Sequence, residues 1–280
     1  MQLFFLRNME TFFIKDDVHF NAKDIFECGQ IFRYVKKEEG VYGVFSADKY
    51  AIVSPSPMGW QIQTKDREYF RHFFDMDTCY GDIISRLIEL SPILKEATEY
   101  GKGIRILKQD LFETIISFII SANNNIKRIQ LIIEKLCLYL GEKTPYGYAF
   151  PTKKTLSSVD AAFFRQIGAG YRADYLQHTA KMLFNDFDLE QLKSMDTASA
   201  RKKLTELKGV GAKVADCILL FGLSRYDVFP VDIWIKKVYH KYYECGLPHS
   251  QIADFFVNKF QNLSGFAQQY LYYYLRNIDK

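Results

Sequence analysis

The sequence predicts an α+β protein in which a small N-terminal antiparallel-sheet domain packs on a larger all-α domain. Two observations predict this class. Before residue 104, β-rich segments stand between turn residues at Val41–Phe45, Tyr50–Val53 and Gly59–Thr64, as in an antiparallel sheet. After residue 104, helical periodicity dominates to the end of the chain. We therefore assign residues 1–104 to the first domain and residues 105–280 to the second, and expect a functional site in the cleft between them.

The composition is that of an ordinary globular protein. With 280 residues and 48% hydrophobic side chains, the chain can form one large or two modest domains with ample core. A formal net charge of +4 is compatible with DNA but does not argue for it alone. No apolar run approaches a membrane span, and the first residues lack the pattern of a signal peptide. We expect an intracellular protein with no membrane partner, cytoplasmic if prokaryotic and nuclear if eukaryotic.

A clear helical pattern begins at Ile126 and ends at Gly141. Its apolar positions recur at steps of three and four: Ile126, Ile129, Ile133, Leu136 and Leu140. Asn123–Asn125 precede this helix and predict a polar cap and turn. Asparagine amides also donate and accept hydrogen bonds at base edges. A capping role and a base-contacting role both stay open.

A glycine hairpin joins two further helices. Asp196 and Thr197 are N-cap types before a helix at Ala198–Leu207, and a second helix at Ala212–Phe221 ends before Gly222. The hairpin between them consists of Gly209, Val210 and Gly211. Glycine permits positive φ and close approach of another backbone. The free N–H groups that open the second helix suit a phosphate, although the hairpin alone also fits an ordinary turn.

Three polar residues follow the hairpin at informative spacings. Lys213 lies in the first turn of the second helix, where the helix end and partial burial would lower the pKa of its amine and favour Schiff-base chemistry. Cys217 shares its helix face four residues later. Asp232 precedes the helical stretch Ile233–Tyr243, whose N-terminus would hold its carboxylate ionised. Taken singly, they also fit a surface lysine, a small core residue and a helix cap.

Five strings carry a family resemblance. They are GQIFRY at 29–34, NNNIKRI at 123–129, GAGYRADY at 168–175, GVGAKVADC at 209–217 and the weaker GFAQ at 265–268. Together they resemble the 8-oxoguanine DNA glycosylases/AP lyases of the helix-hairpin-helix (HhH-GPD) superfamily, over residues 20 to 276. The resemblance implies a helix-hairpin-helix at 198–221. It also implies that Lys213 is the nucleophile that forms a Schiff base, and that Asp232 assists it and stabilises positive charge on the deoxyribose.

The resemblance assigns further roles position by position. The implied lesion-base pocket consists of Gly29, Cys217, Gln268 and Tyr272. In it, the Gly29 carbonyl contacts the lesion, Gln268 reads the Watson–Crick edge, and the base stacks between Cys217 and Tyr272. The implied gap-filling and opposite-base residues are Asn123, Tyr171, Arg128 and Arg172, the two arginines reading the orphaned cytosine. The backbone of Gly209, Val210 and Gly211 would bind a DNA phosphate.

Two positions depart from the family pattern. Tyr272 stands where phenylalanine is usual, so stacking should survive but the hydroxyl needs a partner. Trp234 stands where a histidine often helps to hold a phosphate. The phosphate grip would then rest more on backbone N–H groups and lysines.

The implied partner is double-stranded DNA that contains 8-oxoguanine, preferably opposite cytosine, and we expect a monomer. No cofactor should be required. Of five scattered cysteines, only Cys217 and Cys245 follow the hairpin, so the iron–sulfur loop of related branches is absent from the sequence, and no His/Cys cluster suggests zinc. The family often binds a monovalent cation, which here would use the carbonyls of Thr205, Leu207 and Val210.

Three alternatives stay open on sequence alone. A glycosylase of the same superfamily for another damaged base would keep Asp232, although an alkylpurine enzyme would normally lack Lys213. A non-catalytic helix-hairpin-helix DNA-binding protein would need neither residue. A structural or protein-interaction protein would leave all these residues without a chemical role.

Overall fold

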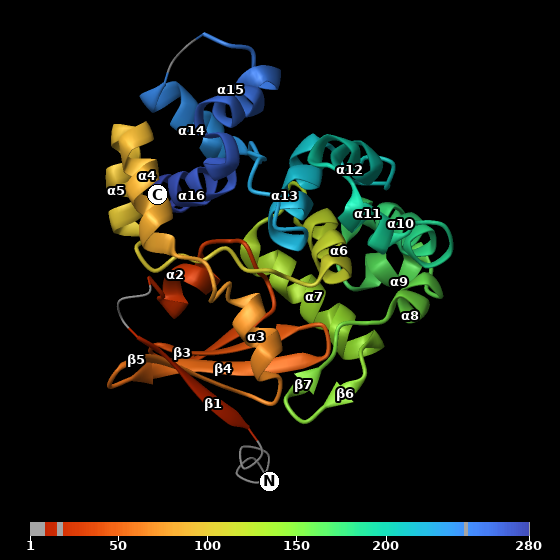
Figure 1. The fold of residues 1–280 in the computed structure, drawn as a ribbon. Coiled ribbons are helices and arrows are strands. Elements are labelled where there is room, and N and C mark those ends of the chain that lie inside the picture. The colour runs from red at the N-terminus through yellow and green to blue at the C-terminus, as the bar shows by residue number, and fades with distance from the viewer. Residues whose placement is uncertain (1–8, 16–18, 244–245, 280) are drawn as a thin grey trace.

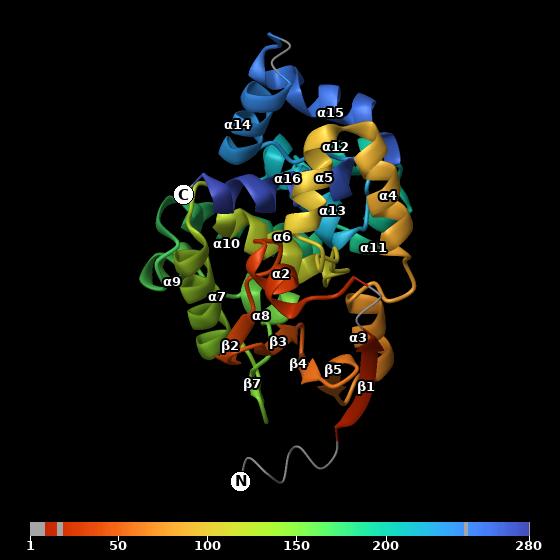
Figure 2. The same cartoon turned by 90° about the vertical axis from the view of Figure 1, so that its left-hand side faces the viewer.

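The computed structural model describes residues 9–15, 19–243 and 246–279, and it confirms the predicted α+β class (Figures 1 and 2). The N-terminal part is a five-stranded antiparallel sheet in the order β1-β5-β4-β3-β2. Its strands are β1 (Glu10–Lys15), β2 (Tyr34–Glu38), β3 (Val41–Ser46), β4 (Lys49–Ser56) and β5 (Gly59–Thr64). In Figure 1 the helical part stands above this sheet. Cys245 and residues 1–8, which the sequence analysis considered, lie outside the described residues.

The three predicted strands are β3, β4 and β5, whereas the two edge strands were not predicted. In β1 only Phe12 and Ile14 are buried, and Phe12 lies opposite Ile62 of β5. β2 is exposed along most of its length. Short, charged edge strands leave little periodic signal in a sequence. Two helices, α2 (Ala22–Glu27) and α3 (Arg67–Phe73), contribute side chains to the core of the sheet.

The helical part contains most of the remaining elements. Their bounds are α4 (Tyr80–Leu90), α5 (Pro92–Tyr100), α6 (Leu111–Ser121), α7 (Ile126–Leu140), β6 (Lys143–Thr144), β7 (Gly147–Tyr148), α8 (Lys153–Ser157), α9 (Ala161–Gln166), α10 (Ala173–Asn185), α11 (Leu189–Ser194), α12 (Thr197–Leu204), α13 (Ala212–Gly222), α14 (Ile233–Tyr242), α15 (Ile252–Phe260) and α16 (Ser264–Ile278). No described helix combines the length and the apolar composition that crossing a membrane requires.

The packing does not divide at residue 104. Helices α4 and α5 precede that residue, yet Leu87, Leu94 and Ala97 belong to the core of the helical part, and α5 packs on α16. Figure 2 shows α4 and α5 beside α16. The predicted boundary therefore describes the order along the chain, whereas the packing assigns α4 and α5 to the helical part.

Buried polar contacts join the two parts next to Gly29. Arg33 forms a buried ion pair with Glu113 of α6 at 3.0 Å. Gln30 is fully buried; its side chain donates to the Arg105 carbonyl at 2.8 Å and accepts from the Leu107 N–H at 2.9 Å. Each bond is made away from water, so losing one would leave a costly unpaired group. The backbone around Gly29 is therefore held in one position against the helical part.

Helix α13 lies at the centre of the helical part. All its residues from Val214 to Phe221 are buried. Asp216 pairs with Arg201 at 2.6 Å, which ties α13 to α12. At Gly265 an added Cβ would overlap Leu220, so this glycine lets α16 approach α13 closely. That approach brings the later residues of α16 beside the start of α13.

The two helices of the hairpin differ slightly from their predicted ranges. α12 ends at Leu204 rather than Leu207, and Gly222 is the last residue of α13 rather than the residue after it. The caps were predicted correctly: Asp196 accepts from the Ser199 N–H at 2.9 Å. Asn125 is the N-cap of α7, where it accepts from the Arg128 N–H at 3.0 Å.

Candidate active site

The hairpin presents backbone rather than side chains. Gly209 has a φ of +85°, and an added Cβ would lie 2.9 Å from Tyr175. Thr179 of α10 fixes the turn through a 2.9 Å bond to the Lys208 carbonyl. Gly211 caps α13 without a side-chain hydrogen bond, and a Cβ there would meet open space. The first N–H groups of α13 are therefore accessible to an outside acceptor, as a phosphate requires.

Lys213 stands in the first turn of α13. Its side chain is half-buried, and its ammonium lies 5.8 Å from the centre of the Phe118 ring on α6. Cys217, Asp232 and Tyr272 interact electrostatically with its amine. Tertiary packing thus gathers residues from α13, α14 and α16 around one lysine.

The pKa of Lys213 corrects the expectation from sequence. Burial lowers this pKa, but Cys217 and Asp232 raise it more, and the net direction is upward. The expected decrease is wrong because it considered burial and the helix end without the groups that packing brings near. Lys213 is therefore an ammonium near neutral pH and would have to lose a proton before it could act as a nucleophile.

Asp232 caps α14 as predicted, accepting from the N–H groups of Trp234 at 3.0 Å and Ile235 at 2.9 Å. Burial nevertheless raises the pKa of its carboxyl, although these N–H groups and Lys213 lower it. The helix N-terminus lowers the pKa of Asp232, as expected, but burial raises it more. A carboxylate with a raised pKa accepts a proton from an ammonium more readily than an ordinary one does.

Cys217 is a neutral thiol near neutral pH. Its side chain is 3% exposed, and burial raises its pKa to about 11 even though Lys213 lowers it. The thiol therefore offers a polarizable surface rather than a negative charge. Asp232 is the carboxyl group whose charge raises the pKa of Lys213.

Gly29 and Tyr272, two residues of the predicted lesion pocket, lie against each other. Gly29 has a φ of +87°, and an added Cβ would lie 3.2 Å from both Cε1 and the hydroxyl of Tyr272. Glycine is therefore required here both for its backbone conformation and for space. The same backbone turn therefore requires glycine and places Gly29 against the Tyr272 ring.

Gln268 shows an unmet hydrogen bond at the same site. Its side chain is 6% exposed, and its Nε2 donates to the Pro230 carbonyl at 3.3 Å. Its Oε1 is buried and has no partner within the described residues. A buried acceptor left unpaired costs about 1–3 kcal/mol. A ligand that donates hydrogen bonds, as the Watson–Crick edge of a guanine does, would relieve that cost.

The four predicted gap-filling and opposite-base residues also come together. The Tyr171 hydroxyl donates to the Ala122 carbonyl at 3.2 Å, and Arg128 donates to the Gly168 carbonyl at 3.2 Å. These bonds join the turn before α7 to the turn before α10. Asn123 stands exposed at the first turn with a φ of +49°.

Arg172 differs from the other three because its side chain is buried. It donates to the carbonyls of Ala122 and Asn123, both at 2.7 Å, and of Ala169 at 3.2 Å. Its guanidinium also lies 4.3 Å from the centre of the Tyr171 ring. Here Arg172 holds Asn123 and Tyr171 in place. Its contact with an orphaned cytosine stays a prediction.

Two residues outside the predicted site support the pocket. Arg276 donates to the Tyr272 hydroxyl at 3.2 Å and supplies the partner that this hydroxyl needs. Gln269 donates to the Cys28 carbonyl at 3.1 Å, beside Gly29. A signal for Arg276 was present, since it follows Tyr272 by four residues and so shares its helix face.

Other predicted features stand apart from this geometry. The Lys237 ammonium lies over the Trp234 ring, 4.3 Å from its centre. This contact places a cation near the start of α14. Within the described ranges, no group of three or more His, Cys, Asp or Glu residues is arranged to hold a metal ion. The monovalent cation at Thr205, Leu207 and Val210 stays a prediction.

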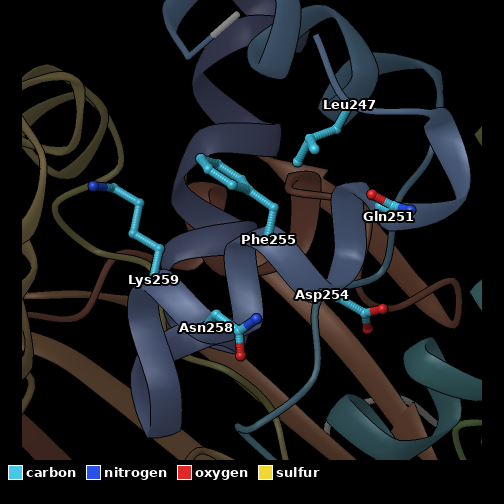
Figure 3. A pocket seen from close by; sticks show the side chains of 6 residues that line it. All are labelled: Leu247, Gln251, Asp254, Phe255, Asn258 and Lys259. Atoms are coloured by element: carbon cyan, nitrogen blue, oxygen red, sulfur yellow. The ribbon is translucent and has the colours of Figure 1, made fainter. Parts of the chain in front are cut away.

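Figure 3 shows a surface pocket at α15 that shares no residue with the predicted site. It is lined by Leu247, Gln251, Asp254, Phe255, Asn258 and Lys259.

Two family models match the chain. Residues 13–115 match the 8-oxoguanine DNA glycosylase N-terminal domain, and residues 116–260 match the HhH-GPD superfamily base excision DNA repair protein. A probable N-glycosylase/DNA lyase of Methanothermobacter thermautotrophicus is 30% identical in an alignment 235 residues long, which covers 75% of this chain and 75% of that protein. An N-glycosylase/DNA lyase of Saccharomyces cerevisiae is 39% identical in an alignment 216 residues long, which covers 69% of this chain and 54% of that protein.

A solved structure agrees with both models. It is the Clostridium acetobutylicum 8-oxoguanine glycosylase/lyase in complex with double-stranded DNA containing cytosine opposite 8-oxoguanine. It matches with a TM-score of 0.89 and 38% identity, over 94% of this chain and 93% of that chain. The chain therefore belongs to the HhH-GPD superfamily of base excision DNA repair proteins, in the group that carries the 8-oxoguanine DNA glycosylase N-terminal domain.

Proposed function

We propose that this protein is a bifunctional DNA glycosylase that excises 8-oxoguanine through a Lys213 Schiff base and then cleaves the strand as an AP lyase. The observation that carries the proposal is that the Lys213 amine lies within electrostatic range of the Asp232 carboxyl and contacts the neutral Cys217 thiol. An amine paired with a proton acceptor is what imine formation at a sugar carbon requires.

The first step is capture of the damaged nucleotide. The N–H groups at Gly211 and the start of α13 bind a phosphate, which positions the duplex without reading its sequence. The lesion nucleotide rotates out of the stack, at an unstacking cost of roughly a few kcal/mol. Asn123 and Tyr171 are exposed at their turns and fill the gap that it leaves.

The chemical step begins with a proton. Asp232 accepts it from the Lys213 ammonium, and the freed amine attacks C1′ as the glycosidic bond breaks. The base leaves with the bonding electron pair and is protonated. The sugar ring then opens to the imine, loss of a C2′ proton expels the 3′ phosphate, and the strand is cut. Glycosylase and lyase activities thus share one nucleophile.

Selection of the damaged base uses the difference at N7. Guanine N7 accepts a hydrogen bond, whereas N7 of 8-oxoguanine carries a proton and donates one. We assign the Gly29 carbonyl as the acceptor that distinguishes them. Gln268 Oε1, which is buried without a partner, accepts from the Watson–Crick edge. A site that leaves a buried group unpaired with the wrong base can discriminate by orders of magnitude.

The opposite base is read from the other side of the gap. Two arginines, Arg128 and Arg172, satisfy the acceptors of cytosine, which favours excision opposite that base. The enzyme works as a monomer on cellular DNA, in the nucleoid of a prokaryote or the nucleus of a eukaryote. It requires no cofactor, and a monovalent cation at the carbonyls of Thr205, Leu207 and Val210 steadies the hairpin.

Borohydride trapping on a duplex with 8-oxoguanine opposite cytosine tests the proposal. The wild-type protein should form a covalent adduct, because only an imine is reduced to a stable link. Lys213→Gln should bind the same duplex but lose both base release and trapping, because no amine remains. A covalent adduct from Lys213→Gln would place the nucleophile elsewhere, and no adduct from wild type would remove the Schiff-base mechanism. Lys208→Gln, a substitution of the same kind just before the hairpin, is the matched control and should still form the covalent adduct.

A further inference from the structure

Arg276 links two segments that are far apart in the sequence. It lies on α16, one turn after Tyr272, and its Nη1 donates to the Tyr272 hydroxyl at 3.2 Å. Its Nη2 donates to the Glu27 carbonyl at the end of α2. Figures 1 and 2 both show α2 directly below α16. One planar guanidinium therefore joins the stacking tyrosine to the N-terminal segment through two separate donors.

This link stands at the edge of Gly29. An added Cβ at Gly29 would lie 2.8 Å from Arg276 Nη1 and 3.2 Å from the Tyr272 hydroxyl. On the other side, Gln269 donates to the Cys28 carbonyl at 3.1 Å. Two side chains of α16 thus hold the backbone on both sides of Cys28. The distance between Gly29 and the Tyr272 ring is set by these bonds rather than by local chain geometry.

The ring itself is also held by the same group. The guanidinium carbon lies 5.1 Å from the centre of the Tyr272 ring, within the range of a cation–π contact. Arginine has no acceptor, so the tyrosine oxygen must accept this bond. Without Arg276 the ring would lose both its hydrogen bond and its contact with the cation.

We propose that Arg276 is a positioning residue of the lesion pocket, which holds the Tyr272 ring at the spacing from Gly29 that a flipped base requires. This inference rests on the proposed function. The inference predicts different effects on the two activities of the enzyme, base excision and cleavage at an abasic site. Base excision needs the base to stack between Cys217 and Tyr272 while it contacts the Gly29 carbonyl. Cleavage at a preformed abasic site has no base to clamp and should not need Arg276.

The test compares single-turnover excision from an 8-oxoguanine duplex with cleavage of a matched abasic duplex. Arg276→Met should slow excision by about tenfold to a hundredfold, because small misplacements of reacting groups have effects of that size. Its abasic-site cleavage should stay within roughly twofold of wild type, which also shows that the variant is folded. Arg276 also lowers the pKa of Asp232, so both activities are measured across a range of pH.

Two further variants sharpen the result. In the Tyr272→Phe background, Arg276→Met should slow excision less than it does in wild type, since the hydroxyl bond is already gone. Lys241→Met is the matched control, because Lys241 also ties down the end of α16, through Asp279 at 3.2 Å, but does not contact the pocket. It should leave both activities unchanged.

Several results would overturn the inference. Equal loss of excision and abasic-site cleavage in Arg276→Met would show a general structural role. Unchanged excision in that variant, or an identical loss in the Tyr272→Phe background, would show that Arg276 does not act through the tyrosine. Failure of the wild-type protein to excise 8-oxoguanine would instead refute the proposed function.

Discussion

The lesion pocket and the gap-filling turns are built in opposite ways. Cys217 and Gln268 of the pocket are 3% and 6% exposed, whereas Tyr171 of the turns is 54% exposed. The pocket draws its residues from α13, α16 and the segment around Gly29. The turns use two short stretches that bond to each other's backbone. Burial makes each unmade hydrogen bond costly, so we expect the pocket to read the chemistry of one base and the exposed turns chiefly to set position.

A single helix connects the two regions. Phe118 of α6 lies 5.8 Å from the Lys213 ammonium and stacks on Phe221 of α13. The same helix ends at Ser121, two residues before Asn123. Lys213, the proposed nucleophile, and the exposed Asn123 are thus attached to one packed pair of helices. Variants in either region can be compared on one scaffold, with different activities as readouts.

Among the substitutions considered below, Asp232→Asn should have the largest effect. The asparagine can still cap α14, but it cannot take the proton of Lys213. Base excision should therefore fall by roughly 10²–10⁴-fold, the usual contribution of a general acid or base. Single-turnover kinetics with a thermal melt as the folding control would measure this. Wild-type turnover in the variant would reduce Asp232 to a helix cap.

The same variant makes a prediction about pH. Asp232 raises the pKa of Lys213, so its removal should lower that pKa. The rising limb of borohydride trapping at a preformed abasic site should then move to lower pH in Asp232→Asn. A limb at an unchanged pH would mean that Asp232 does not act on the charge of Lys213.

Gly29→Ala should come second. The positive φ strains an alanine, and its Cβ would lie 2.8 Å from Arg276 and displace it. We expect the preference for 8-oxoguanine over guanine opposite cytosine to fall by about one to two orders of magnitude, because one buried hydrogen bond is misplaced. Matched duplexes and abasic-site cleavage, which should persist, would separate this from unfolding. An unchanged ratio of 8-oxoguanine excision to guanine excision would show that Gly29 has only a conformational role.

Substitutions in the turns should have the smallest effects. Arg128→Ala should flatten the preference for cytosine by about 1–3 kcal/mol, the usual value of a bidentate base contact. Arg172→Ala should flatten it too, and should also loosen Asn123, whose carbonyl Arg172 holds. Excision rates opposite each of the four bases would measure both. Equal excision opposite all four by wild type would remove the assignment.

Local signals made much of the site predictable. The caps at Asp196, Asn125 and Asp232 follow from side chains that bond N–H groups two or three residues ahead, so neighbouring residues suffice to find them. The helix at 126–140 follows from its apolar period in the same way. By contrast, the edge strands β1 and β2 carry few inward residues, and no local pattern placed α4 and α5 against α16.

The sequence by itself determined the α+β class, the glycine hairpin, and the residue types that carry the chemistry, because these are written in spacings of a few residues. Only the tertiary structure decided their state. It raised the pKa of Lys213 by bringing in Cys217 and Asp232, turned Arg172 inward onto three carbonyls, and placed Arg276 between Tyr272 and Glu27. Burial and charge at each of these positions depend on partners that lie far away in the chain, and chain folding alone brings them within interaction distance.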